Sequence, residues 1–192
     1  MLNKLKFSDL DDQQLVDVRS QHDYQAGHVE NALNLNPGNF KKYASYFIDK
    51  NEPIIFIVGK EDSALEDLET TAQELGFAKV EGYLLAEELP SEALVTTGTI
   101  SAEAFSEKTE NFILLDVRQP AEITRPAPEL NLVNIPFEDL IDKYQTLDTS
   151  KEIYTLCGSG NRSTAAASFL ESKGIQSEVI EGGMKAIQAA QQ

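Results

Sequence analysis

The chain repeats itself at an interval of about one hundred residues, and this repeat constrains the fold more than any other feature. The sequence Leu-Val-Asp-Val-Arg at 15–19 recurs as Leu-Leu-Asp-Val-Arg at 114–118, which is 99 residues later. Three further pairs of segments align, the last two with a small gap: 54–59 with 153–158, 75–77 with 173–175, and 79–83 with 179–184. Matches in register over a domain-sized interval indicate a duplicated domain and not a solenoid of short repeats.

Each copy alternates short apolar segments, which are typical of strands, with segments of helical pattern. In the second copy we expect strands at 112–116, 132–135, 153–157 and 178–181, and helices near 101–108, 137–144, 163–172 and 184–190. This alternation predicts an α/β fold in which each domain has a mostly parallel sheet flanked by helices. We expect the domains at 1–90 and 99–192, with a linker at about 91–98, where Ser, Thr and Gly cluster.

Composition and charge exclude several classes of function. Hydrophobic residues make up 41% of the 192 residues, which is enough for a buried core and argues against disorder. The net charge of −16 disfavours binding to nucleic acid and to anionic membranes. No apolar run reaches the ~20 residues that span a membrane, and the first residues lack a signal-peptide pattern. A single cysteine cannot form an internal disulfide, so we expect a cytoplasmic protein.

That single cysteine, Cys157, lies in a glycine-rich loop between a predicted strand and a predicted helix. Such a loop directs backbone N–H groups inward at the positive end of a helix dipole, which favours the ionised thiol. The alternative is a small buried cysteine at a strand end, but the glycines, the arginine and the helix start together favour a reactive thiol. We predict Cys157 as catalytic and the rest of the loop as substrate-binding: Gly158, Ser159, Gly160, Asn161, Arg162 and Ser163.

With these motifs in place, the chain resembles a tandem rhodanese, a two-domain member of the sulfurtransferase family. Both copies carry Asp-Val-Arg, and the first has the sequence Gly-His-Val-Glu-Asn-Ala at 27–32, similar to the family's Gly-His-Ile-x-Gly-Ala signature. The second has the Cys157 loop and the glycine pair Gly182 and Gly183. The resemblance covers nearly the whole chain and implies two rhodanese-like domains.

The two copies depart from the family pattern in different ways. In the first, Val58 aligns with Cys157, and the following residues include the carboxylates Glu61 and Asp62 but no nucleophile. This loop cannot hold a sulfane sulfur covalently, so the resemblance implies an inactive first domain and an active second one. In the second copy, Thr-Arg-Pro-Ala-Pro at 124–128 replaces the Gly-His signature.

The resemblance also suggests a partner. Some members of the family are fused behind a metal-dependent persulfide dioxygenase domain, and this chain is similar to the tail of such a fusion. The sequence itself carries no metal-binding cluster. His22 and His28 lie near Asp23, but the family's Gly-His position is normally structural, so we expect no metal and no cofactor.

The residues and the resemblance together imply a double displacement. Cys157 takes a sulfane sulfur from thiosulfate or a low-molecular-weight persulfide and passes it to a thiol, cyanide or sulfite acceptor. Loop N–H groups stabilise the sulfur anions, and Arg162 pairs with the anionic donor or leaving group. Ser159 either contacts the donor or fits the turn, and Asn161 or Ser163 is expected to cap the following helix.

Other functions are compatible with parts of the pattern. Cysteine-dependent phosphatases carry Cys-x5-Arg, whereas Arg162 gives Cys-x4-Arg, a smaller cradle that favours sulfur over phosphate and also disfavours an arsenate reductase. A persulfide-sensing or sulfur-carrier module without turnover is the main alternative, and an inert scaffold is a third. The loop matches mercaptopyruvate enzymes at 157–160 and then diverges, which favours thiosulfate or persulfide donors. We expect the Asp-Val-Arg motifs to form structural ion pairs.

Overall fold

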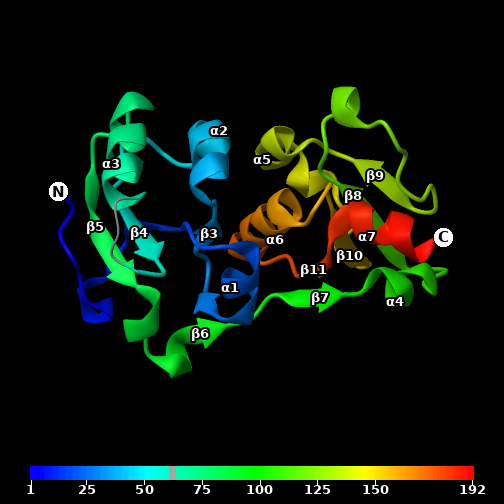
Figure 1. The fold of residues 1–192 in the computed structure, drawn as a ribbon, viewed down its shortest axis with the longest axis horizontal. Coiled ribbons are helices and arrows are strands. Elements are labelled where there is room, and N and C mark those ends of the chain that lie inside the picture. The colour runs from blue at the N-terminus through cyan, green and yellow to red at the C-terminus, as the bar shows by residue number, and fades with distance from the viewer. Residues whose placement is uncertain (61–63) are drawn as a thin grey trace. The chain divides into compact units, whose positions relative to one another are not determined.

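The structure is a computed structural model of the chain, and it describes residues 1–60 and 64–192. The chain divides into two compact units, Met1–Thr96 and Thr97–Gln192. Each unit has a parallel sheet with helices against it, as Figure 1 shows for each unit separately. The predicted fold class, two α/β domains with mostly parallel sheets, is therefore confirmed.

The first unit is built on a four-stranded parallel sheet of order β3-β1-β4-β5. Its strands are β1 (Gln14–Asp17), β2 (His28–Val29), β3 (Leu33–Asn34), β4 (Ile54–Val58), β5 (Val80–Leu85) and β6 (Leu94–Val95). Its helices are α1 (Gln21–Ala26), α2 (Pro37–Phe47) and α3 (Ala64–Glu74), with 3-10 turns η1 (Phe7–Asp9), η2 (Ala86–Glu88) and η3 (Ser91–Ala93).

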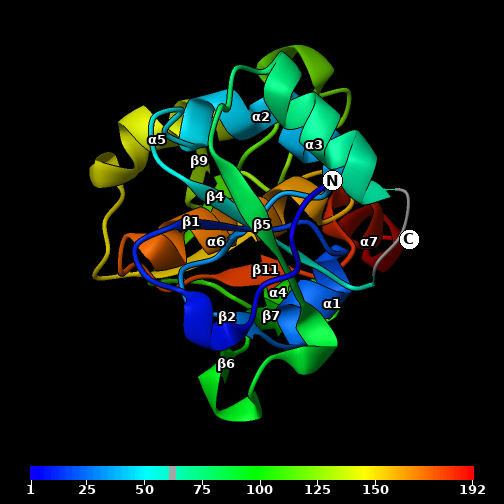
Figure 2. The same cartoon turned by 90° about the vertical axis from the view of Figure 1, so that its left-hand side faces the viewer.

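Strand β4 of this sheet is apolar throughout because both of its faces are covered. All five of its residues are buried. Ile55 and Ile57 join a core cluster with Tyr24 of α1. Phe56 points the other way, and its ring centroid lies 5.2 Å from that of Phe40 in α2. Figure 2 shows α2 and α3 together on one side of the β4–β5 sheet and α1 on the other.

The predicted linker at 91–98 contains secondary structure. It includes η3 and β6, and β6 pairs antiparallel with β2, where His28 faces Val95. The next strand, β7 (Gly98–Ile100), pairs in parallel with β11 (Glu178–Ile180) and so belongs to the second sheet. We did not predict β7, because a three-residue strand has too short a pattern to stand out from the sequence around it.

The second unit has a five-stranded parallel sheet of order β7-β11-β10-β8-β9. Its other strands are β8 (Phe112–Asp116), β9 (Leu132–Asn134) and β10 (Glu152–Leu156). Its helices are α4 (Ala102–Ser106), α5 (Leu140–Lys143), α6 (Asn161–Ser172) and α7 (Gly183–Ala190), with 3-10 turns η4 (Pro120–Glu122), η5 (Phe137–Asp139) and η6 (Tyr144–Thr146).

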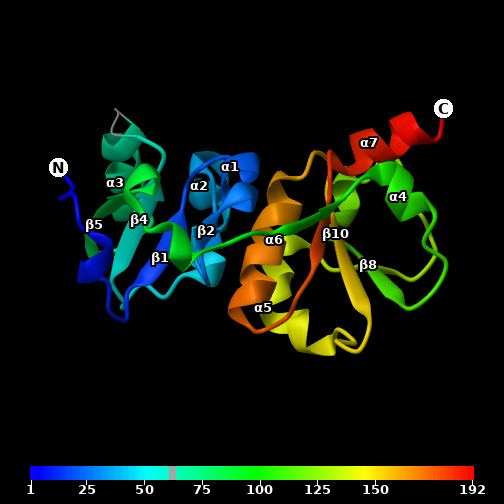
Figure 3. The same ribbon diagram turned by 90° about the horizontal axis from the view of Figure 1, so that it is seen from below.

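Helices cover both faces of this second sheet. Phe105 of α4 packs edge-on against Phe112 and Tyr154, with ring centroids 5.5 and 5.4 Å away. Ile187 of α7 joins the same cluster. Helix α6 lies on the opposite face, as Figure 3 shows, and its residues from Ser163 to Leu170 are buried. Among the described residues, no helix is long and apolar enough to cross a membrane.

The parallel arrangement brings the carboxyl ends of β8, β9 and β10 to one edge of the second sheet. Strand β8 has the predicted bounds, and β10 ends at Leu156, so Cys157 is the first residue beyond it. The expected helix at 137–144 is instead divided into η5, α5 and η6. Because ligands of parallel sheets bind beyond the carboxyl ends of strands, the Cys157 loop lies where this fold places its sites.

Candidate active site

Three polar groups surround the sulfur of Cys157. The backbone N–H groups of Gly160 and Ser163 donate to Sγ, at 3.1 and 3.3 Å. The thiol lies 3.4 Å from Ser163 Oγ and donates to it; once the proton leaves, the hydroxyl can rotate and donate to sulfur. Cys157 is 1% exposed, so these donors act where little water competes. The arrangement favours a sulfur anion.

The loop reaches this geometry because Gly160 adopts a left-handed conformation. Its φ is +105°, and it stands at the N-cap of α6, which begins at Asn161. The prediction that Asn161 or Ser163 caps this helix is wrong, because the helix begins earlier than expected and no side chain occupies the cap. Ser163 instead lies inside the first turn, where its N–H and Oγ face the sulfur.

The start of α7 supports the loop from the other side. The N–H of Met184 donates to the Cys157 carbonyl at 2.9 Å, and that of Lys185 donates to the Gly158 carbonyl at 3.3 Å. Gly183 permits this approach, because a Cβ there would lie 2.4 Å from the Cys157 carbonyl oxygen. Gly183, the second glycine of the pair that carries part of the family resemblance, therefore has a packing function.

Arg162 forms a two-pronged ion pair with Glu122. One guanidinium nitrogen lies 2.8 Å from Glu122 Oε2, and the second bonds Oε1. Glu122 closes η4, the turn after β8, and its Oε2 also accepts from the N–H of Gln119 at 3.2 Å. We did not identify Glu122 from sequence: the spacing from Gln119 to Glu122 indicates a capped turn, but not a partner 40 residues away.

The two Asp-Val-Arg motifs form ion pairs, as predicted, and both partners of the second pair are buried. Arg118 lies 2.8 Å from Asp116, and Arg19 lies 2.7 Å from Asp17. Arg118 also donates to the Arg125 carbonyl at 3.2 Å. Arg19 makes the equivalent bond to the carbonyl of Gly27, the glycine of the Gly-His signature. The segment that replaces Gly-His in the second copy thus still supplies a carbonyl acceptor to the motif.

The remaining predicted loop residues lie on its outer side. Gly158, Ser159 and Asn161 are partly exposed, whereas Gly160 is buried. A Cβ on Gly158 would meet no atom within 4 Å. The predicted site residues therefore separate into an inner group that contacts the sulfur and an outer group that borders solvent.

The first unit has no thiol at the equivalent position. Val58 ends β4 and is 5% exposed. It lines a cavity of about 210 Å³ together with Arg19, Gly59 and Lys60. The two carboxylates expected in this loop, Glu61 and Asp62, lie outside the described residues. An alkyl side chain at this place offers no nucleophile.

His28 is part of the core of the first unit. It is fully buried, and its ring stacks on that of Tyr24 with centroids 3.7 Å apart. Its Nδ1 lies 2.9 Å from the Tyr24 carbonyl, which can only accept, so this nitrogen carries the proton. Across residues 1–60 and 64–192, no three His, Cys, Asp or Glu side chains gather as metal ligands.

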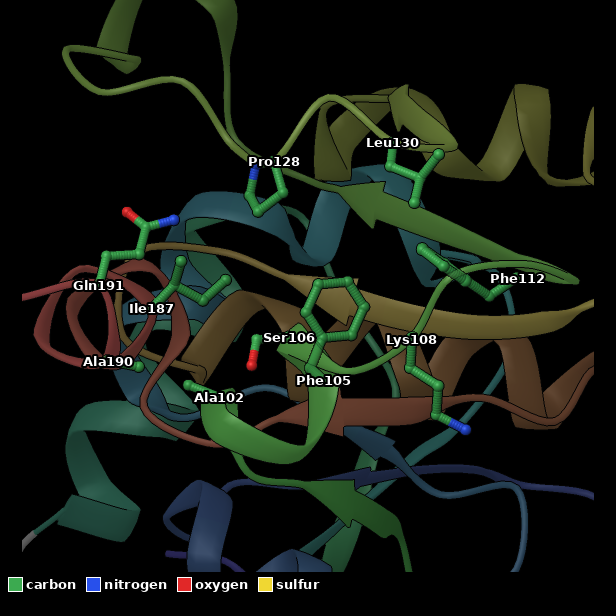
Figure 4. A pocket seen from close by; sticks show the side chains of 10 residues that line it. All are labelled: Ala102, Phe105, Ser106, Lys108, Phe112, Pro128, Leu130, Ile187, Ala190 and Gln191. Carbon is green, nitrogen blue, oxygen red and sulfur yellow. The ribbon is translucent and has the colours of Figure 1, made fainter.

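A separate cavity of about 270 Å³ lies in the second unit, and Figure 4 shows its lining. Phe105, Phe112, Leu130 and Ile187 make it mainly apolar. Phe112 is the first residue of β8, whereas Cys157 follows the last residue of the parallel strand β10. The cavity and the Cys157 loop therefore lie at opposite ends of these strands.

We expect Ser163→Ala to slow the reaction of Cys157 with a sulfane donor by about ten- to a hundredfold, since one hydrogen bond to a charged group is worth roughly 1.5–3 kcal/mol. The backbone donors remain, so activity is reduced and not lost. Stopped-flow measurement of persulfide formation at pH 7 tests this. An unchanged rate would show that the hydroxyl does not assist the sulfur.

Comparison with known proteins identifies the fold family. The sequence profile described as the Rhodanese-like domain matches twice, at residues 3–85 and 101–190. YtwF of Bacillus subtilis, which carries a provisional sulfurtransferase name, is 36% identical over 91 residues, covering 45% of this chain and 86% of YtwF. A tRNA sulfurtransferase of Haemophilus ducreyi is 32% identical over 80 residues, covering 40% of this chain and 16% of that protein.

One solved structure with a similar sequence covers about half of this chain. A rhodanese-related protein from Thermoplasma volcanium is 33% identical, covers 48% of this chain and 91% of its own, and superposes with a TM-score of 0.45. The double match of the family profile accounts for most of the sequence, and each match coincides with one compact unit. The chain therefore belongs to the rhodanese-like domain family, of which it carries two copies in tandem.

Proposed function

We propose that this protein is a sulfurtransferase that carries sulfane sulfur as a persulfide on Cys157. The observation that carries the proposal is the set of polar groups around Sγ. The N–H groups of Gly160 and Ser163 donate to the sulfur, and the Ser163 hydroxyl accepts from the thiol and can donate to the thiolate. Fixed dipoles of this kind stabilise a sulfur anion before and after transfer. Family membership and relatives named as sulfurtransferases support sulfur transfer in general.

The reaction is a double displacement in which no external oxidant takes part. The Cys157 thiolate attacks the outer sulfur of the donor, the donor's S–S bond breaks, and the leaving group departs with the electron pair. With thiosulfate the leaving group is sulfite; with a persulfide R–S–SH it is R–S⁻. The acceptor thiolate then attacks the outer sulfur of the Cys157 persulfide and regenerates the Cys157 thiolate. Cyanide or sulfite accepts in the same way.

The second unit performs both half-reactions in this proposal. The first unit has Val58 where the second has Cys157, so it contributes no sulfur carrier at that position. The N–H groups of the loop stabilise the sulfur anion that attacks the donor.

Turnover separates the enzyme from a sensor or carrier that binds sulfur once. We expect wild-type protein supplied with excess donor and cyanide to form many thiocyanate molecules per Cys157, and with a thiol acceptor to form many persulfides. Release that stops at one sulfur per Cys157 would exclude the enzyme and support the non-catalytic carrier.

A further inference from the structure

The charge of Arg162 is already balanced in the structure. Glu122 meets the guanidinium in a parallel, two-pronged arrangement, with Nη1 at 2.8 Å from Oε2. The side chains are 18% and 35% exposed, so the pair is partly withdrawn from water. The Gln119 N–H also holds Oε2, which fixes the carboxylate on the η4 turn.

A second carboxylate adds to the negative charge around this turn. The side-chain amide of Gln119 donates to Oε1 of Glu138, in η5 just after β9. Oε2 of Glu138 is buried and has no hydrogen-bond partner among the described residues. Gln119 therefore links two carboxylates, Glu122 and Glu138, and Arg162 compensates one of them. Glu122 and Glu138 follow the carboxyl ends of β8 and β9, at the edge of the sheet that also carries Cys157.

This arrangement treats the two candidate donors differently. Thiosulfate brings two negative charges to a thiolate, and its leaving group, sulfite, departs with two. A sulfonate that binds Arg162 must either displace Glu122 or lie beside its carboxylate, and in both cases a dianion meets a negative charge at close range. A persulfide reacts with a thiolate in its protonated form, R–S–SH, which brings no charge at its reacting sulfurs. Because R–S⁻ leaves with a single charge, the Arg162–Glu122 pair can stay closed.

We infer that Glu122 determines donor specificity: by neutralising Arg162 it favours a low-molecular-weight persulfide over thiosulfate as the sulfur donor. The inference rests on the proposed function and assigns its substrate class. The bond that breaks is the S–S bond of the persulfide, and the sulfur that moves is the outer one, so Cys–S⁻ and R–S–SH give Cys–S–SH and R–S⁻.

The test compares kcat/KM for thiosulfate and for 2-hydroxyethyl persulfide, a donor with an uncharged R group. Glu122→Gln removes the charge but keeps an oxygen to accept from the Gln119 N–H. We expect it to raise kcat/KM for thiosulfate about fivefold, the effect of freeing one partly exposed ion pair, and to change kcat/KM for the persulfide less than about twofold. Wild type should prefer the persulfide.

Two controls isolate the pair. Glu110→Gln makes the same charge change on an exposed residue before β8, at the other end of the strand. It should change kcat/KM for neither donor. In an Arg162→Gln background, Glu122→Gln should raise kcat/KM for thiosulfate no more than Glu110→Gln does in that same background. The Arg162→Gln, Glu122→Gln double variant leaves no unpaired charge at this position. It can therefore test the specificity role of Glu122 even if Glu122→Gln alone is unstable.

The outcomes separate the inference from the proposed function. If donors place sulfur on Cys157 but Glu122→Gln leaves the thiosulfate value unchanged or lowers it, the specificity role is wrong and the sulfurtransferase stands. If no donor places sulfur on Cys157 of wild type, the proposed function fails and the inference fails with it.

Discussion

Cys157→Ser is expected to lower the rate of sulfur transfer by about a thousandfold or more, the scale seen when an enzyme loses its nucleophile. Serine fits the same space and can accept the hydrogen bonds that Gly160 and Ser163 donate to the sulfur. Its hydroxyl cannot form a persulfide. We therefore expect the fold to persist, with a free energy of unfolding within about 1 kcal/mol of wild type.

Mass spectrometry gives this prediction a clear readout, because Cys157 is the only cysteine in the chain. After incubation with 2-hydroxyethyl persulfide and removal of excess donor, wild type should carry one extra sulfur atom and the serine variant none. Val58→Cys in the Cys157→Ser background is the matched control, since it restores a thiol at the aligned position of the other copy. We expect little sulfur transfer from it, and transfer at the wild-type rate would contradict the assignment of the site to the second unit.

The repeat and the strand patterns predicted the architecture well, because buried parallel strands carry a strong local signal. β8 is apolar at four of its five positions and has the predicted bounds. Strand β7 and the divided segment η5–α5–η6 were not predicted, since pieces of three or four residues depend on tertiary contacts. β7, for example, is defined by its pairing with β11.

The site was predictable in part for the same reason. The position of Cys157 between a strand and a helix follows from local sequence, and so does the presence of N–H groups around it. The Arg162–Glu122 pair does not, because it joins the turn after β8 to the first turn of α6. The cap of α6 was misplaced because a left-handed glycine can end a loop without the side-chain signal that cap prediction uses.

Gly183→Ala is expected to destabilise the second unit by about 3 kcal/mol, through two separate costs. The residue has a φ of +60°, which alanine adopts at a cost of about 1 kcal/mol. The new Cβ would also lie 2.4 Å from the Cys157 carbonyl oxygen and 2.8 Å from backbone atoms of Gly158. Backbone cannot rotate away as a side chain can, so the loop or the start of α7 must move.

Calorimetry and a rate measurement together test this account. Gly174→Ala is the matched control, because Gly174 has a φ of +74° but a Cβ there would meet no atom within 4 Å. Gly174→Ala should therefore lower the free energy of unfolding by only about 1 kcal/mol, the cost of placing alanine at a positive φ, and leave the rate of sulfur transfer unchanged. Gly183→Ala should lower the Tm of the second unit by more than about 10 °C. At temperatures where it is still folded, it should also slow persulfide formation, since the Cys157 carbonyl is held by the Met184 N–H beside the substitution. Equal effects of the two variants would mean that contact between Gly183 and the Cys157 loop does not position the nucleophile.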